Sequence, residues 1–194
     1  MWTVVGLGNP GRMYSQTRHN AGVMFIKRLA QEWDVKLKRK KYSAKAGEAI
    51  LSGSRVFLVL PQTYMNQSGL AVRQMRDTVR ISTERLIVVF DDLDIPLGEI
   101  RVRKAGGPGT HKGMDSVIQE LKTTKFPRIR IGVAPQEPYE DSTSFVLSPF
   151  AKEEKCLFDD SLEKAKEALE MIVAGDIEKA MNTYNRKTEK EEIT

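Results

Sequence analysis

The stretch LIVVFDDLD at Leu86–Asp94 decides the fold of this 194-residue chain. Its first five residues, Leu86–Phe90, are all apolar, a pattern typical of a central strand that is buried on both faces of its sheet. Three carboxylates, those of Asp91, Asp92 and Asp94, follow directly. Sites in layered α/β folds form beyond the carboxyl ends of strands, so these carboxylates are candidate site residues. A polar turn that closes the strand is the simpler alternative.

Helix and strand patterns alternate on both sides of this run. The further predicted strands are Thr3–Gly6, a hairpin of Gly47–Leu51 and Arg55–Leu60, and two strands in which arginines alternate with apolar residues, Ile100–Arg103 and Arg128–Ile131. The predicted helices are Asn20–Trp33 with Asn20 as N-cap, Ser68–Arg80, Met114–Leu121, Glu153–Ala174 ended by Gly175, and Ile177–Tyr184. We therefore expect a single-domain, layered α/β fold over residues 1–185, with a central mixed β-sheet flanked by helices. Residues 186–194 are expected to form a frayed, charged tail.

Composition narrows the class of protein. Hydrophobic residues make up 40% of the chain, yet no apolar run approaches the ~20 residues of a membrane-spanning helix. The first residues lack a basic leader, so no signal peptide is expected. The single cysteine, Cys156, excludes an intramolecular disulfide framework and a zinc site built on cysteine pairs. We expect a cytoplasmic, monomeric protein whose net charge of +5 permits an anionic partner.

The segment Gly6–Gly11, GLGNPG, matches the glycine pattern of dinucleotide-binding loops. In those loops the third glycine opens a helix that meets the pyrophosphate, whereas helical spacing here begins only near Val23. A tight glycine turn is the favoured interpretation, and a nucleotide-dependent enzyme is kept as an alternative. The sequence also lacks the H-E-x-x-H, G-x-S-x-G and G-K-[ST] patterns of common hydrolases.

Three polar side chains lie where strand ends are predicted to meet. His19 precedes the first helix, Asn66 follows the strand Arg55–Leu60, and Asp91 follows Leu86–Phe90. A carboxylate can accept an imidazole N–H and fix its tautomer, and an amide can donate to a carbonyl oxygen. The residues alone thus indicate a histidine-dependent hydrolase of an anionic substrate. The simpler alternatives are an exposed loop histidine and an asparagine that caps the next helix.

Several blocks of the sequence, in order, carry a resemblance to a known family. They are Val4–Gly11 (VVGLGNPG) with Tyr14 and Thr17–Gly22 (TRHNAG), Pro61–Gly69 (PQTYMNQSG), Asp91–Gly98 (DDLDIPLG), Gly106–Gly113, Arg128–Val133 (RIRIGV), Phe145–Leu147 and Ala180–Asn182. Together they resemble the bacterial-type peptidyl-tRNA hydrolases from about Val4 to Asn185. The resemblance implies one α/β domain around a mixed sheet. It also implies hydrolysis of the ester between a peptide and the 3′-terminal ribose of tRNA, without a metal or another cofactor.

The resemblance also implies roles for individual residues. His19 becomes the base that activates water and Asp91 the partner that orients it, while Asn9 and Asn66 place the substrate. The other implied substrate-binding residues are Tyr14, Tyr64, Met65, His111 and Lys112. Arg103 and Arg130 are implied to bind tRNA phosphate, so the expected partner is peptidyl-tRNA, held by its acceptor end and 5′-phosphate region.

Two positions depart from the family pattern. Lys112 stands where relatives usually carry asparagine, and Pro108 stands where a histidine is common. A non-catalytic RNA-binding relative of the same fold therefore remains an alternative at this point. Among the basic residues, Arg103 and Arg130 belong to the two arginine-bearing strands, whereas the cluster Lys36–Lys41 is expected to be an ordinary solvated surface.

Overall fold

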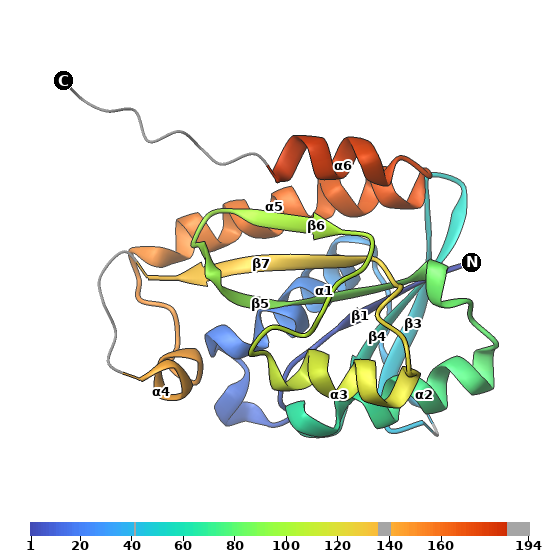
Figure 1. Cartoon of the computed structure of the whole chain (residues 1–194), viewed down its shortest axis with the longest axis horizontal. Coiled ribbons are helices and arrows are strands. Elements are labelled where there is room, and N and C mark those ends of the chain that lie inside the picture. Colours follow the sequence, from blue (N-terminus) through green and yellow to red (C-terminus); the bar gives the residue numbers. More distant parts are fainter. Residues whose placement is uncertain (41, 136–140, 186–194) are drawn as a thin grey trace.

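The computed structural model describes residues 1–40, 42–135 and 141–185. The predicted tail, 186–194, lies outside the described residues. Within them the strands form one seven-stranded sheet in the order β2-β3-β4-β1-β5-β7-β6 (Figure 1). The strands are β1 Trp2–Gly6, β2 Lys38–Lys40, β3 Ala44–Leu51, β4 Ser54–Pro61, β5 Leu86–Pro96, β6 Ile100–Arg103 and β7 Arg128–Ala134. Strands β1, β4, β5 and β7 run parallel and the other three pair antiparallel, which confirms the predicted mixed sheet.

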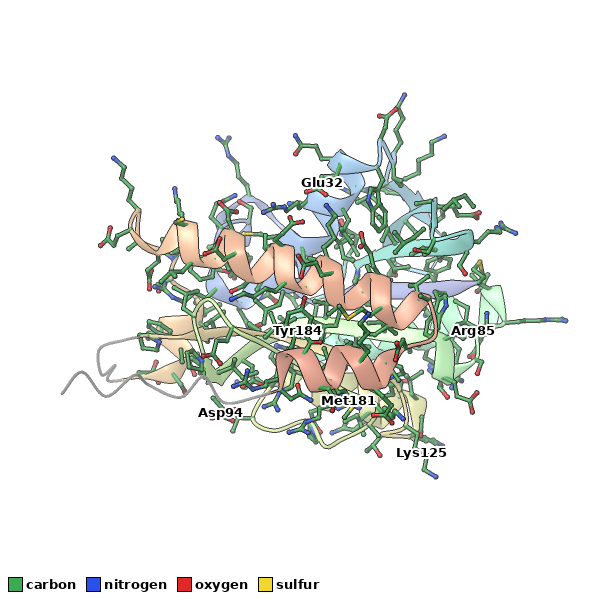
Figure 2. The ribbon with its side chains drawn as sticks, turned by 90° about the horizontal axis from the view of Figure 1, so that it is seen from above. Glu32, Arg85, Asp94, Lys125, Met181 and Tyr184 are labelled. Carbon is green, nitrogen blue, oxygen red and sulfur yellow. The ribbon has the colours of Figure 1, made fainter. Side chains whose placement is uncertain are left out.

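Helices cover both faces of the sheet. They are α1 Ala21–Glu32, α2 Ser68–Val79, α3 Lys112–Leu121, α4 Ser142–Val146, α5 Glu154–Val173 and α6 Ile177–Tyr184. Four short 3-10 helices join them: η1 Arg12–Tyr14, η2 Arg18–Asn20, η3 Met65–Gln67 and η4 Thr83–Arg85. Figure 2, seen from above, shows α5 and α6 side by side over the sheet, where the Tyr184 hydroxyl donates to Glu167. Of the helices in the described residues, none has the length and apolar character to span a bilayer.

The alternation of side chains along β5 separates two cores. Ile87 and Val89 pack with α1 and α5, whereas Leu86, Val88 and Phe90 pack with α2 and α3. All five side chains are at most 3% exposed, as the continuous apolar run predicts. Because side chains alternate along a strand, the side chain of residue 91 lies on the same face as Ile87 and Val89, the face that α1 covers.

Glycines bring α1 into direct contact with the sheet. A Cβ at Gly6 would lie 2.1 Å from the Gly22 carbonyl oxygen, and a Cβ at Gly22 would lie 2.3 Å from the Val89 carbonyl oxygen. Gly6 thus serves close helix-to-strand packing, Gly11 adopts a positive φ of 105°, and α1 begins only at Ala21. This packing sets η2, which precedes α1, beside the carboxyl half of β5.

Two local predictions need correction, and a third is confirmed with one addition. Strand β5 continues to Pro96, so Asp91–Asp94 lie within it rather than after it, because β7 extends alongside and pairs Asp91 with Ile131. Asn20 occupies the N-cap position of α1, but its side chain makes no capping hydrogen bond because it binds the backbone of Asn9 instead. The basic cluster is exposed as expected over 38–40, where it also forms the edge strand β2.

Candidate active site

A cavity of about 830 Å³ opens at the carboxyl ends of the central strands. Its walls come from η2, η3, the carboxyl half of β5, the loop before α3, strands β6 and β7, and α4. Of the residues predicted from the sequence, the cavity is lined by Asn9, His19, Tyr64, Met65, Asn66, Asp91, Arg103, His111, Lys112 and Arg130. Tyr14, on η1, is not among the lining residues.

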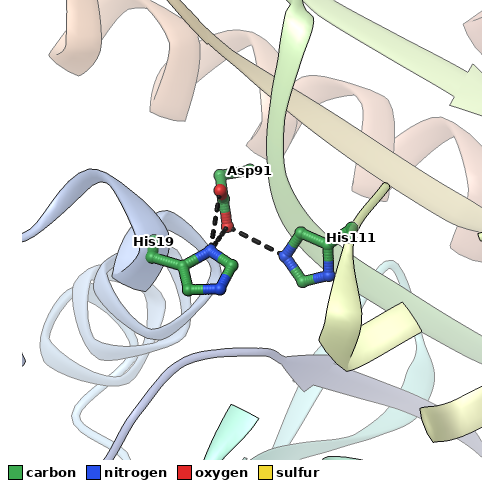
Figure 3. Close-up of side chains that lie close together, drawn as sticks. All are labelled: His19, Asp91 and His111. Atoms are coloured by element: carbon green, nitrogen blue, oxygen red, sulfur yellow. Dashed lines mark hydrogen bonds and ion pairs between the residues drawn. The ribbon is translucent and has the colours of Figure 1, made fainter. Parts of the chain in front are cut away.

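His19 and Asp91 are in direct contact. The Nδ1 atom of His19 lies 3.0 Å from Oδ1 and 2.9 Å from Oδ2 of Asp91 (Figure 3). An ionised carboxylate only accepts hydrogen bonds, so Nδ1 carries the proton and donates it. The Nε2 atom of a neutral His19 then keeps its lone pair, on the side of the ring that is turned away from Asp91 (Figure 3).

A second imidazole binds the same carboxylate. The Nε2 atom of His111 lies 3.0 Å from Asp91 Oδ1, and the two ring centroids are 4.8 Å apart. The Asp91 side chain is 3% exposed, against 14% for His19 and 8% for His111. Burial on its own would raise the pKa of Asp91, but the electrostatic attraction and hydrogen bonds of His111 and His19 hold the pKa of this carboxyl well below its usual range. Asp91 is therefore ionised at neutral pH.

These three residues are the one group in the described part of the chain with donor atoms placed closely enough to consider a metal ion. The tautomer of His111 argues against that use. Its Nδ1 accepts a hydrogen bond from the Met114 backbone N–H at 3.1 Å, so the proton of the neutral ring is on Nε2. A metal on Nε2 would move that proton to Nδ1 and set it against the Met114 N–H. The two imidazoles and the carboxylate are thus better suited to share protons through hydrogen bonds than to bind a metal ion.

The loop that carries His19 is anchored by its neighbour. The Arg18 guanidinium, 5% exposed, donates to the Pro149 carbonyl at 2.5 Å and to the Ser148 hydroxyl at 2.8 Å, and pairs with Glu154 at 2.5 Å. A guanidinium can make several such bonds from one rigid plane. Arg18 therefore joins η2 to the segment that follows α4, whose first residue, Leu147, lines the cavity.

Carboxamides occupy the wall next to His19. The Oδ1 atom of Asn9 accepts from the Met65 backbone N–H at 2.8 Å, which leaves the Nδ2 amino group as the end of Asn9 available to the cavity. Asn20 fixes the Asn9 backbone through two hydrogen bonds of 2.8 and 2.9 Å. Asn66 lies on η3 rather than at the N-cap of α2, which Gln67 occupies, and its side chain is exposed in the cavity. Tyr64, 59% exposed, stands at the cavity edge beside buried Met65.

The basic side of the cavity is built by two neighbouring strands. Strands β6 and β7 pair antiparallel, with Arg101 opposite Arg130 and Arg103 opposite Arg128. Arg103 is exposed, whereas the Nε atom of Arg130 pairs with Asp92 at 2.5 Å. Arg128 is not part of a solvated face: it is 2% exposed and donates to backbone carbonyls of the loop before α3 and of the segment that leads into β7. Burial lowers the pKa of Arg128 to about 10.

Comparison with known proteins decides the family. A model of the family described as peptidyl-tRNA hydrolase matches residues 3–192. The chain belongs to the peptidyl-tRNA hydrolase family. Among its relatives, the peptidyl-tRNA hydrolase of Alkaliphilus metalliredigens is 46% identical over 185 residues, covering 95% of this chain and all of that protein. The peptidyl-tRNA hydrolase of Chloroflexus aggregans is 42% identical over 186 residues, covering 95% of this chain and 99% of that protein.

Solved structures agree with this family. A crystal structure of a peptidyl-tRNA hydrolase with N-propanol superposes with a TM-score of 0.89 at 34% identity, covering 98% of this chain and 97% of the other. The peptidyl-tRNA hydrolase of Acinetobacter baumannii gives a TM-score of 0.87 at 35% identity, covering 94% of this chain and 93% of the other. The fold expected from the resemblance is therefore confirmed. The relatives carry the name of an enzyme, so the non-catalytic alternative has no support.

Sequence reasoning missed part of the cavity. Helix α4 contributes Ser142 and Thr143, although only Phe145–Leu147 had been singled out as a family block. Asp141 caps this helix by accepting from the Ser144 N–H at 2.7 Å, so an Asp followed by Ser and Thr was an available signal. The contact between His111 and Asp91 had no local signal, because twenty residues separate them.

Proposed function

We propose that this protein hydrolyses the ester bond between a peptide and the 3′-terminal ribose of tRNA, and so recycles peptidyl-tRNA released prematurely from ribosomes. The observation that carries this proposal is the His19–Asp91 pair, which opens into a cavity with carboxamides on one side and arginines on the other. The cavity thus offers a base, neutral donors for a carbonyl, and cations for phosphates. Family membership supplies the substrate class.

His19 acts as the general base in this proposal. Its Nε2 lone pair takes a proton from a water molecule as that water attacks the ester carbonyl carbon. The attack forms a tetrahedral intermediate, and the proton held on Nε2 then passes to the departing ribose 3′-oxygen as the ester C–O bond breaks. Asp91 keeps the proton of His19 on Nδ1 throughout, and its charge stabilises the imidazolium that forms.

Asn9 and Asn66 position the ester. Because the Oδ1 atom of Asn9 is occupied by the Met65 N–H, its amino group faces the cavity as a fixed donor. Donors that are fixed before the reaction stabilise a developing oxyanion without reorganisation. Tyr64 and Met65 form the adjoining wall, where the apolar parts of the substrate pack.

Arg103 and Arg130 bind the phosphates of the acceptor end and the 5′-phosphate region. Phosphate contacts fix the register of a nucleic acid without reading its sequence, which suits an enzyme that must act on many tRNAs. The two guanidiniums lie on adjacent strands at one side of the cavity, which supports a continuous path from the ribose ester to the tRNA body. We propose that the protein acts as a monomer in the cytoplasm, where this substrate is found.

The direct test is cleavage of an N-blocked aminoacyl-tRNA by the purified protein, followed as release of the blocked amino acid. We expect multiple turnovers, at the same rate with and without a chelator, because His19 and Asp91 activate water without a metal. The matched control is the same tRNA carrying an amide-linked amino acid, which should bind without release. Tight tRNA binding without any ester cleavage would contradict the proposal, and a rate abolished by the chelator would contradict its metal-free mechanism.

A further inference from the structure

Among the described residues, His111 is the buried titratable group beside the base for which the mechanism above has no step. We propose that His111 is a positioning residue locked as a neutral hydrogen-bond donor, and that by sharing Asp91 with His19 it sets the lower end of the pH range in which the enzyme works. The inference rests on the proposed function, since it takes His19 as the base. It concerns how strongly Asp91 favours the protonated form of His19.

The tautomer of His111 is fixed by the first turn of α3. Met114 is the third residue of this helix, and its backbone N–H would have no partner within the helix. The Nδ1 atom of His111 accepts that N–H at 3.1 Å and so serves as the N-cap. A proton on Nδ1 would face the Met114 N–H and would also place a cation at the positive end of the helix dipole. His111 is therefore held neutral, with its one proton on Nε2.

The position of the His111 ring is set by packing. Its edge meets the Phe90 ring, with centroids 4.8 Å apart at an interplanar angle of 61°. A Cβ at Gly113 would lie 2.4 Å from Met65 Sδ and 3.0 Å from His111 Cε1, so the glycine lets Met65 and the ring pack closely together. The ring thus points Nε2–H at Asp91 as a permanent donor, 3.0 Å from Oδ1.

Sharing the carboxylate weakens its effect on His19. Asp91 Oδ1 accepts from His19 and His111 at the same distance, 3.0 Å, while among the described residues Oδ2 accepts from His19. A donor that stabilises a carboxylate reduces the negative charge it offers to another partner. The imidazolium of His19 is therefore less favoured with His111 present than it would be beside Asp91 alone. As a consequence, His19 stays unprotonated, and able to act as the base, down to a lower pH.

The other charged groups around His19 stay constant in a test of this idea. The further titratable and charged side chains that line the cavity are Tyr64, Asp92, Asp94, Arg103, Lys112, Arg128 and Arg130. On the His19 element itself, Arg18 is paired with Glu154. Helix α4 carries no titratable side chain, and those of α1 begin at Lys27, in its second turn. A change confined to residue 111 therefore isolates the contribution of His111.

Two amide variants separate the two hydrogen bonds of His111. His111→Asn offers an acceptor near the place of Nδ1, so it keeps the cap on Met114 but does not reach Asp91. His111→Gln offers a donor near the place of Nε2, so it reaches Asp91 but leaves the cap. We expect the acid limb of kcat/KM against pH to move upward in His111→Asn by about half a pH unit or more, the scale on which a hydrogen bond alters a neighbouring titration. In His111→Gln the acid limb should stay and Tm should fall instead.

A measurement without substrate tests the same point. The chain has two histidines, so the ring ¹⁵N signals are few and His19 is the only one left in His111→Asn. We expect the wild-type His111 signals to show the tautomer with the proton on Nε2 and none on Nδ1, as its two hydrogen bonds require. The titration midpoint of His19 should be higher in His111→Asn than in the wild type and unchanged in His111→Gln.

The outcomes distinguish this inference from the proposed function. If the wild type cleaves no ester, the function fails, and the NMR titration still decides whether His111 shares Asp91. If His111→Asn leaves both the acid limb and the His19 midpoint in place, the inference is wrong. A shift of equal size in His111→Gln would equally overturn it, because the effect would then follow the helix cap and not the bond to Asp91.

Discussion

The two sides of the cavity are built on different principles. On the histidine side, Asp91, His19 and His111 are at most 14% exposed, and both imidazoles are hydrogen-bonded to Asp91. On the basic side, Arg103 is exposed, and Arg130 is a quarter exposed and paired with a carboxylate. Proton transfer needs fixed distances, whereas attraction of phosphate depends on net charge over longer range. Substitutions on the first side should therefore lower turnover, and substitutions on the second should weaken binding.

The largest effect is expected for His19→Ala. Removing the proposed base should lower kcat by about 10²–10⁴-fold, the usual contribution of general base catalysis. Binding of tRNA, measured by fluorescence anisotropy, should stay within about twofold because the arginines of the other side are intact. Near-normal turnover in this variant would show that His19 is not the base. The proposed difference in function between the two sides of the cavity would then not hold.

Asp91→Asn should have the next largest effect. The amide keeps the shape of the side chain but loses the charge that stabilises the imidazolium, and a hydrogen bond to a charged group is worth about 1.5–3 kcal/mol, or about 10- to 150-fold in rate. Single-turnover assays at saturating enzyme would measure this loss apart from binding. A variant with unchanged kcat would show that the orientation of His19 does not depend on the carboxylate.

The same variant also tests how the ionised Asp91 contributes to the stability of the fold. The folded-state pKa of Asp91 is lowered, so its ionisation stabilises the fold fully above its unfolded value, about 3.9, and this stabilisation is lost as the pH falls below that value. We expect urea unfolding to show the wild type more stable than Asp91→Asn at pH 6. The difference should shrink on acidification below about pH 4. A difference that grows on acidification would have the opposite sign and would contradict the lowered pKa.

On the basic side, Arg103→Ala and Arg130→Ala should each lower the slope of log K against log salt by about one. Affinity at low salt should fall by about tenfold or less, while kcat at saturation changes little. Arg55→Ala is the matched control, because Arg55 is also an exposed strand arginine but does not line the cavity. Equal slopes for all three variants would mean that the two arginines form no specific phosphate site.

The contrast also explains what the sequence could predict. Patterns that depend on near neighbours were found: the helix at Ile177–Tyr184 is where spacing put it, and the apolar run Leu86–Phe90 is the buried centre of the sheet. The extension of β5 through Asp91–Asp94 was missed because local polarity indicates a turn, while pairing with β7 sustains the strand. The strand periodicity gives Arg128 no sign of burial, since two of the carbonyls that hold it come from a loop some twenty residues earlier.

The candidate site was predictable as a set of residue types and strand ends rather than as a geometry. His19, Asn66 and Asp91 were grouped because parallel strands end at one edge, and all three line the cavity. The sequence could not show that His111 reaches Asp91 or that Asn20 holds Asn9, since each pair is joined across separate elements. Such contacts follow from the packing of α1 and α3 against opposite faces of the sheet.

The smallest effect is expected for Lys112→Asn, at the boundary between the two sides. Lys112 is the first residue of α3, exposed in the cavity, where its charge opposes the helix dipole at a cost of about 0.3–1 kcal/mol. Removing it should therefore raise Tm slightly. If the ammonium meets a phosphate of the bound tRNA end, the same change should raise KM a few-fold, while Lys112→Arg should keep KM near the wild-type value. A higher Tm with an unchanged KM would place Lys112 with the solvated surface and would move the boundary of the binding side to Arg103.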